Sequence, residues 1–222
     1  MNLANLSVAK KLIAAFSILG LVILVSGGIA ILQTTRIEEA ATISDRTALQ
    51  AKSVNAVLAE AAKMQAAIRG LLITGSSTYG KEYEMLGGQM DAAIRTALDD
   101  AAGDEALVAN INEIDGIVDA WRSGPAARQM TLMRHPDTVN EARAIEVTGA
   151  GEEMADKLNE AATKAVAILD ASSARAGAEQ ASALGTTFLV VLLSAVITLV
   201  ASTGFFFWLS RSIGAPIRSI TG

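Results

Sequence analysis

The chain of 222 residues contains no cysteine, a single histidine and only three prolines. Without cysteine it can form neither a disulfide nor a thiolate nucleophile. One histidine, His135, cannot build a histidine metal cluster or a Ser–His–Asp triad. The sequence therefore predicts no enzymatic centre, no cofactor and no metal site in these residues.

Acidic residues are missing from both ends of the chain. All 23 Asp and Glu lie between Arg36 and Glu179, with 14 of the 18 Lys and Arg, so this middle region carries a net charge of −9. The two ends carry only basic charges and a net charge of +4. The acidic middle disfavours nucleic acid as a partner, because its phosphates would be repelled.

Two long runs without charge separate the basic ends from the acidic middle. Residues 12–32 and residues 184–209 each supply the roughly 20 apolar residues that a helix needs to cross a hydrocarbon core. Both should be helical, because lipid offers no partners for backbone polar groups. A cleaved signal peptide is the alternative for the first run. Its apolar part is longer than such peptides have, and Ile31–Arg36 offers no small-residue cleavage site.

Short basic flanks remain in the cytoplasm, so we expect a multi-pass protein of the bacterial inner membrane with both termini cytoplasmic and lipid around both spans. The expected parts are a cytoplasmic tail (1–11), a first transmembrane helix (12–32), a periplasmic domain (33–183), a second transmembrane helix (184–209) and a cytoplasmic segment (210–222).

The periplasmic region has the three- and four-residue hydrophobic spacing of packed helices rather than the alternation of strands. Its four apolar stripes are Ile43, Val54, Val57, Ala61, Met64, Ile68, Leu71; Tyr79, Tyr83, Leu86, Met90, Ala97; Leu107, Ile111, Ile114, Val118, Trp121; and Met154, Leu158, Ala161, Ala165, Ile168. Thr47 and Gln50 add polar layers to the first stripe. Helix breaks are expected at Gly70, Gly75–Ser77, Gly103–Asp104, Ser123–Pro125, His135–Pro136 and Gly149–Gly151.

These stripes predict an all-α protein: a membrane-anchored, antiparallel four-helix bundle whose first and last helices continue into the two transmembrane helices. The stripes are thin and rich in alanine, which predicts a modest core. A second copy packed alongside would bury more surface, so we expect a parallel homodimer.

The segment Arg69–Gly75, read as Arg-Gly-Leu-Leu-Ile-Thr-Gly and followed by Tyr79 and Tyr83, resembles the signature of CHASE3 sensor domains. Ser7–Phe16 is similar to the start of bacterial chemoreceptors with a four-helix-bundle sensor. Residues 211–220 resemble the first residues of a HAMP signal-relay helix. These resemblances leave open whether the domain is a CHASE3 domain or a plain four-helix chemoreceptor bundle.

The resemblance implies the N-terminal part of a methyl-accepting chemotaxis protein. Such a receptor would sense a periplasmic ligand or binding protein and relay the signal through HAMP to a cytoplasmic kinase and its coupling protein, encoded beyond Gly222. CHASE3 and HAMP also precede histidine-kinase and diguanylate-cyclase domains, so the input half of an enzyme is the alternative. A purely structural membrane coiled coil is a third interpretation.

Five residues are candidates for ligand contact: Arg69, Tyr79, Tyr83, Trp121 and Arg122. An arginine can bind a small carboxylate through two hydrogen bonds, as receptors for amino or organic acids require. It can equally pair with an acidic residue on a neighbouring helix or donate to carbonyls at a helix end. The aromatic residues equally fit the packing stripes. Asp99, Asp100 and Asp104 could suggest a cation site, but aspartate beside glycine more often caps a helix.

Another five residues are candidates for signal relay: Trp208, Arg211, Ile213, Pro216 and Ile217. Trp208 precedes a basic residue, as tryptophan does where it lies at the membrane interface. Pro216 lacks an amide proton and disfavours helix at Ala215, which predicts a local discontinuity just beyond the membrane. The resemblance to HAMP gives that segment its relay role.

Overall fold

A computed structural model describes residues 8–218, apart from the side chains of Val8, Lys11, Ala15 and residues 209–210 and 212–218. Every regular element in residues 8–218 is helical, which confirms the all-α class. The elements are α1 (Val8–Thr74), α2 (Ser77–Asp100), α3 (Glu105–Trp121), the π-helical turn η2 (Arg122–Ala126), α4 (Ala127–Leu132), the 3-10 turn η3 (Pro136–Thr138), α5 (Val139–Val147) and α6 (Ala150–Arg218). They form two compact units, Thr42–Arg175 and Met1–Ala41 with Ala176–Gly222.

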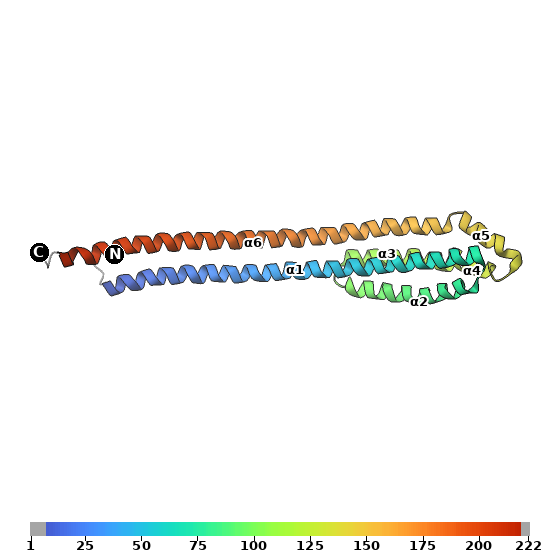
Figure 1. The fold of residues 1–222 in the computed structure, drawn as a ribbon, viewed down its shortest axis with the longest axis horizontal. Helices are drawn as coiled ribbons and strands as arrows, with labels where there is room; N and C mark the ends of the chain where they lie inside the picture. The colour runs from blue at the N-terminus through green and yellow to red at the C-terminus, as the bar shows by residue number, and fades with distance from the viewer. Residues whose placement is uncertain (1–7, 219–222) are drawn as a thin grey trace. The chain divides into compact units, whose positions relative to one another are not determined.

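The unit Thr42–Arg175 is an antiparallel bundle of α1, α2, α3 and α6, with α4 and α5 in the connection between α3 and α6 (Figure 1). The turns between α1, α2 and α3 are short, so successive helices reverse direction. Gly75 has φ 70° and Gly103 has φ 90°, values that glycine adopts without steric cost. After Gly103, Asp104 caps α3 by accepting a hydrogen bond from the Leu107 amide at 3.0 Å.

The core of the bundle is built from the four predicted stripes. Its fully buried large side chains include Met64, Ile68, Met90, Leu107, Ile111, Ile114 and Val118. The polar layers are also confirmed, since Thr47 and Gln50 are buried. Three stripe positions were wrong: Ile43 is 40% exposed, Tyr79 is 36% exposed, and Ile168 is half-buried while Leu169 enters the core.

Within the bundle, two predicted helix breaks do not occur. Gly70 lies inside α1, and a Cβ there would be 2.7 Å from the ring of Tyr79, so this glycine permits close approach of α1 and α2. At Ser123–Pro125 the chain does not break but widens into η2, where the Ala127 amide bonds to the Arg122 carbonyl five residues back. The wider π turn accommodates Pro125, which lacks an amide proton and would crowd the preceding turn of an α-helix.

The second unit contains the apolar parts of α1 and α6. Two helices are long and apolar enough to cross a membrane, with mean hydropathies of 2.5 and 2.4 in their most apolar windows, of which 0% and 6% is buried. Large side chains such as Leu24, Phe188 and Leu199 are more than half exposed. Exposure of this kind distinguishes both segments from the core helices of a soluble protein.

Candidate functional site

The centre of the candidate site is Trp121, the last residue of α3. Its side chain is 4% exposed and meets the ring of Tyr83 from α2 edge to face, with ring centroids 6.0 Å apart and planes at 73°. Burial raises the pKa of Tyr83, and the charge of Arg122 partly opposes this shift. The structure thus brings together three of the five ligand candidates: Tyr83, Trp121 and Arg122.

Arg122 is an ion-pair residue rather than a free anion receptor. Its Nη1 donates to Asp91 Oδ1 at 2.7 Å and lies 3.4 Å from Asp119 Oδ1, which joins α2 to α3. Burial lowers the pKa of Arg122, but the hydrogen bond and charge of Asp91, with the charge of Asp119, raise it overall. Both contacts use Nη1, so the charge of Arg122 is compensated within the bundle.

Arg69 lies in a separate polar cluster that connects α1 to α5. Its Nε donates to Glu146 Oε1 at 2.7 Å, and the buried Gln129 donates to the other carboxylate oxygen at 3.3 Å. Nearby, Arg143 Nε donates to the Leu72 carbonyl at 2.7 Å, at the end of α1. Of the three roles considered for Arg69, the structure supports pairing with an acid on another helix.

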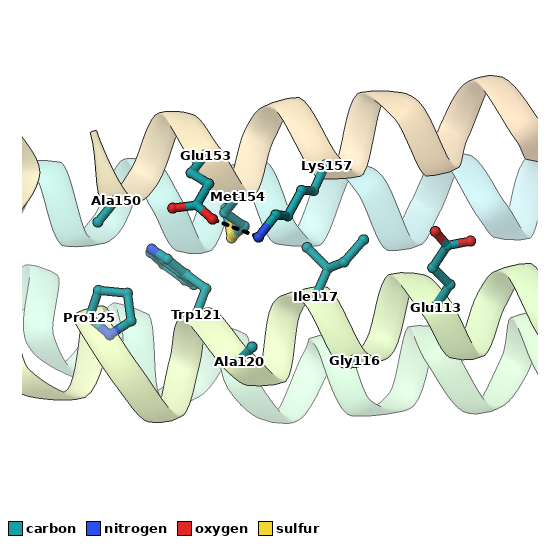
Figure 2. Close-up of a pocket in the computed structure, with 10 residues that line it drawn as sticks. All are labelled: Glu113, Gly116, Ile117, Ala120, Trp121, Pro125, Ala150, Glu153, Met154 and Lys157. Atoms are coloured by element: carbon teal, nitrogen blue, oxygen red, sulfur yellow. Dashed lines mark hydrogen bonds and ion pairs between the residues drawn. The ribbon is translucent and has the colours of Figure 1, made fainter. Parts of the chain in front are cut away.

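Beside Trp121 lies a groove of about 380 Å³ between α3 and the first turns of α6 (Figure 2). We call it the Trp121 groove. From α3 it is lined by residues that include Glu113, Gly116 and Trp121, and from α6 by Glu153, Met154 and Lys157. Gly116 and Ala120 leave room on the α3 wall because neither projects a large side chain.

The charges around the Trp121 groove are paired. Lys157 Nζ donates to Glu153 Oε1 at 2.6 Å, and Lys164 Nζ donates to Glu113 Oε1 at 2.8 Å. The hydrogen bond and charge of Lys157 lower the pKa of Glu153, and the hydrogen bond to Glu113 raises that of Lys164. The groove therefore offers an apolar surface with balanced charges at its rim.

No group of three or more His, Cys, Asp or Glu side chains that could hold a metal occurs among the described residues. The three aspartates considered for a cation have separate surroundings. Asp104 caps α3, and Asp100 accepts a short hydrogen bond from Ser53 of α1.

The relay candidates fall near the end of α6. Trp208 lies 5.7 Å from Phe205 between ring centroids and is 36% exposed, and Arg211 is exposed. The side chains of Ile213, Pro216 and Ile217 lie outside the described residues. The backbone of α6 is helical through Pro216 to Arg218, so the predicted break at this proline is not seen.

Sequence reasoning missed the two sides of the Trp121 groove. Glu113, Gly116 and Lys157 were not among the predicted ligand contacts. A usable signal was the pair of small residues Gly116 and Ala120, which leave space beside Ile117 and Trp121 on α3. Nothing in the sequence indicated which helix faces that side.

The fold defines an all-helical chain, with an antiparallel bundle in one unit and long apolar helical segments in the other. The chain belongs to the CHASE3 domain family, whose pattern matches residues 40–179. CHASE3 domains are sensory domains found in chemoreceptors and histidine kinases. No curated protein and no solved structure matches the chain.

Proposed function

We propose that the chain is the sensory and transmembrane part of a chemoreceptor that detects a signal outside the cytoplasm. The observation that carries this proposal is the position of the CHASE3 domain, residues 40–179, between two apolar helical segments. The chain ends beyond these segments carry basic residues and no acidic ones. In this proposal residues 12–32 and 184–209 span the bacterial inner membrane, and both termini are cytoplasmic.

The output element is α6. It begins beside the Trp121 groove at Ala150, contributes Met154, Leu158 and Ala161 to the bundle core, and continues as one helix to Arg218. A stimulus that favours one packing of this helix over another would displace it by about 1–2 Å, as helix shifts do in other switches. The stimulus can change the populations only through its different affinity for the two packings.

The homodimer, the HAMP segment from Arg211, and a kinase with its coupling protein complete the proposed receptor. A histidine kinase or diguanylate cyclase is the second candidate, because CHASE3 domains occur in kinases as well as in chemoreceptors. The gene sequence beyond codon 222 separates them. A long heptad hairpin with Glu/Gln pairs supports the chemoreceptor, whereas a phosphoacceptor histidine with an ATP-binding domain, or a cyclase domain, overturns it in favour of an enzyme.

The proposed topology can be tested because the chain has no native cysteine. Thr96 and Ala9 are both exposed, one in the bundle and one in the N-terminal part of α1. In cells with a permeable outer membrane, we expect a membrane-impermeant maleimide to label Thr96→Cys at once and Ala9→Cys only after lysis. Equal labelling of both variants before lysis contradicts the topology.

A further inference from the structure

The Trp121 groove contains a polar group that the bundle leaves without a partner. The side chain of Trp121 is 4% exposed, and its indole Nε1 has no hydrogen-bond partner among the described residues. Figure 2 shows the ring extending from α3 toward α6, with the nitrogen at the end of the ring nearest Ala150. A buried donor without an acceptor is unfavourable, so a ligand that supplies an acceptor gains from it.

We propose that the Trp121 groove is the ligand site of the sensor and that it takes a small molecule with an apolar body and a carbonyl or carboxylate oxygen. That oxygen accepts a hydrogen bond from Trp121 Nε1. The groove volume of about 380 Å³ lies within the range of small-molecule sites. Ile117, Ala120 and Met154 supply apolar surface for the body. This inference rests on the proposed function, since it names the ligand of that sensor.

The rim of the groove accepts a carboxylate as well as a neutral carbonyl. Lys157 is paired with Glu153, but both side chains are largely exposed, at 57% and 70%. Exposed pairs of this kind contribute little stability, so Lys157 can exchange Glu153 for a ligand carboxylate. A cationic ligand can pair with Glu153 in the same way, but it gains no hydrogen bond from Trp121 and should therefore bind more weakly.

Binding in this groove acts on α6 directly. Its walls are α3 and the first turns of α6, and the indole nitrogen is closed off from solvent between them. Because solvent does not reach Nε1, a ligand oxygen can bond to it only after a wall of the groove moves, and we infer that this wall is the beginning of α6. The ligand therefore binds the parted arrangement better, which is the differential affinity that a switch requires.

The test uses the full chain in lipid nanodiscs, with Trp208→Phe so that Trp121 is the single tryptophan. Three probes of similar size are titrated while Trp121 fluorescence is recorded: benzoate, benzamide and benzylamine. We expect saturable responses to benzoate and benzamide at millimolar concentrations or below, the range that so small a ligand supports. Benzylamine, which offers no acceptor oxygen, should bind more weakly than either of the other two probes.

Filling the groove provides the matched variant. A Cβ at Gly116 or at Gly88 meets no atom within 4 Å, but only Gly116 lines the groove. We expect Gly116→Leu to weaken binding of benzoate and benzamide at least about tenfold, whereas Gly88→Leu on α2 leaves it unchanged. Trp121→Phe, followed by the probe-induced rise in Tm, should lose the response while retaining an aromatic ring.

The proposal is overturned if neither acceptor probe gives a saturable response, if benzylamine binds equally well, or if Gly116→Leu binds as tightly as the parent. These outcomes leave the receptor function intact, because the topology and the downstream sequence are measured independently of the groove. Loss of the expected topology with normal probe binding would overturn the receptor function and leave the groove as a ligand site.

Discussion

Arg122 compensates a local concentration of negative charge between α2 and α3. Its guanidinium pairs with Asp91 and Asp119, while Asp115 lies one helical turn before Asp119 on α3. The Arg122 side chain is 27% exposed, so its ion pairs are less screened than those at the surface. Because Asp91, Asp115 and Asp119 surround this single arginine, its positive charge stabilises the contact between α2 and α3.

Replacing Arg122 by glutamine removes both ion pairs and leaves the aspartates uncompensated. We expect Arg122→Gln to lower the free energy of unfolding by about 1–2 kcal/mol, between the values for surface and buried pairs. Thermal unfolding followed by circular dichroism measures it. The control is Arg128→Gln at an exposed position, where the change should stay within about 0.5 kcal/mol. Equal losses in both variants would contradict the role given to Arg122.

Asp115 should make the stability depend on pH. Its pKa is raised by burial first and by the charges of Asp119 and Asp91 next, with Arg122 opposing. The folded chain thus binds this proton more tightly than the unfolded chain. Stability therefore falls as pH rises from the unfolded pKa through the folded one, and it remains lower above that window.

We expect Asp115→Asn to raise the free energy of unfolding at pH 7 by a few tenths of a kcal/mol, the size of a like-charge repulsion one turn apart. The gain should disappear at about pH 3, where the carboxyl group is protonated in both states. Thermal unfolding at the two pH values measures it. Asp170→Asn, at an exposed site that forms no ion pair among the described residues, is the control.

At the scale of the element, η2 shifts the buried face of the helical segment that starts at Glu105. Its inward positions follow steps of three and four through Val118 and Trp121. A regular α-helix would next turn residues 125 and 128 inward, but the buried residues are Ala126 and Gln129, each one position later. The π turn therefore absorbs one extra residue.

Deleting Pro125 should restore a regular α-helix with Ala126 and Gln129 still inward. We expect the change in free energy of unfolding to stay within about 1 kcal/mol, because the deletion removes both the extra residue and the missing amide proton. Deleting Gly116 instead turns Val118 and Trp121 by about 100° out of the core. That variant should fail to fold cooperatively in the same thermal experiment. Similar stabilities for the two deletions would contradict the register argument.

The helices were predictable because each apolar stripe is a local pattern that repeats every three or four residues. Pro125 was read as a break because a sequence does not reveal that a π turn can accommodate a proline. The roles of Arg69 and Arg122 stayed open for a different reason. Glu146 lies 77 residues from Arg69, and Asp91 lies 31 residues from Arg122, and spacing along the chain does not predict which helices meet.

At the scale of the whole molecule, the apolar segments of α1 and α6 determine where the protein resides. Leu192 in the second segment and Val166 in the bundle have similar exposures, 51% and 56%. If lipid surrounds Leu192 and water surrounds Val166, an arginine should be tolerated only at the second position. The exposed fraction of a side chain does not by itself tell whether lipid or water surrounds it.

We expect Leu192→Arg to reduce insertion strongly, because a central arginine costs about 2.5–3.5 kcal/mol in a transmembrane helix. Val166→Arg should leave the amount of protein in the membrane fraction unchanged. Carbonate extraction of membranes followed by immunoblotting measures both. Equal recovery of the two variants would contradict a transmembrane position for residues 184–209.

Polar contacts fix both long helices of the bundle. The beginning of α6 accepts hydrogen bonds from Gln65 of α1, at the Gly151 carbonyl (2.6 Å), and from Asn110 of α3, at the Ala161 carbonyl (3.0 Å). Lys164 of α6 pairs with Glu113 of α3 at 2.8 Å. In α1, Gln50 donates to the Asp100 carbonyl at 3.1 Å and Ser53 bonds to the Asp100 side chain, which fixes that helix to the α2–α3 turn. Between Ala165 and Arg175, α6 forms no hydrogen bond or ion pair to another helix among the described residues, and it packs there through Ala165 and Leu169. A force applied at the beginning of α6 would therefore act against polar contacts as far as Lys164, and only against apolar packing from Ala165 to Arg175.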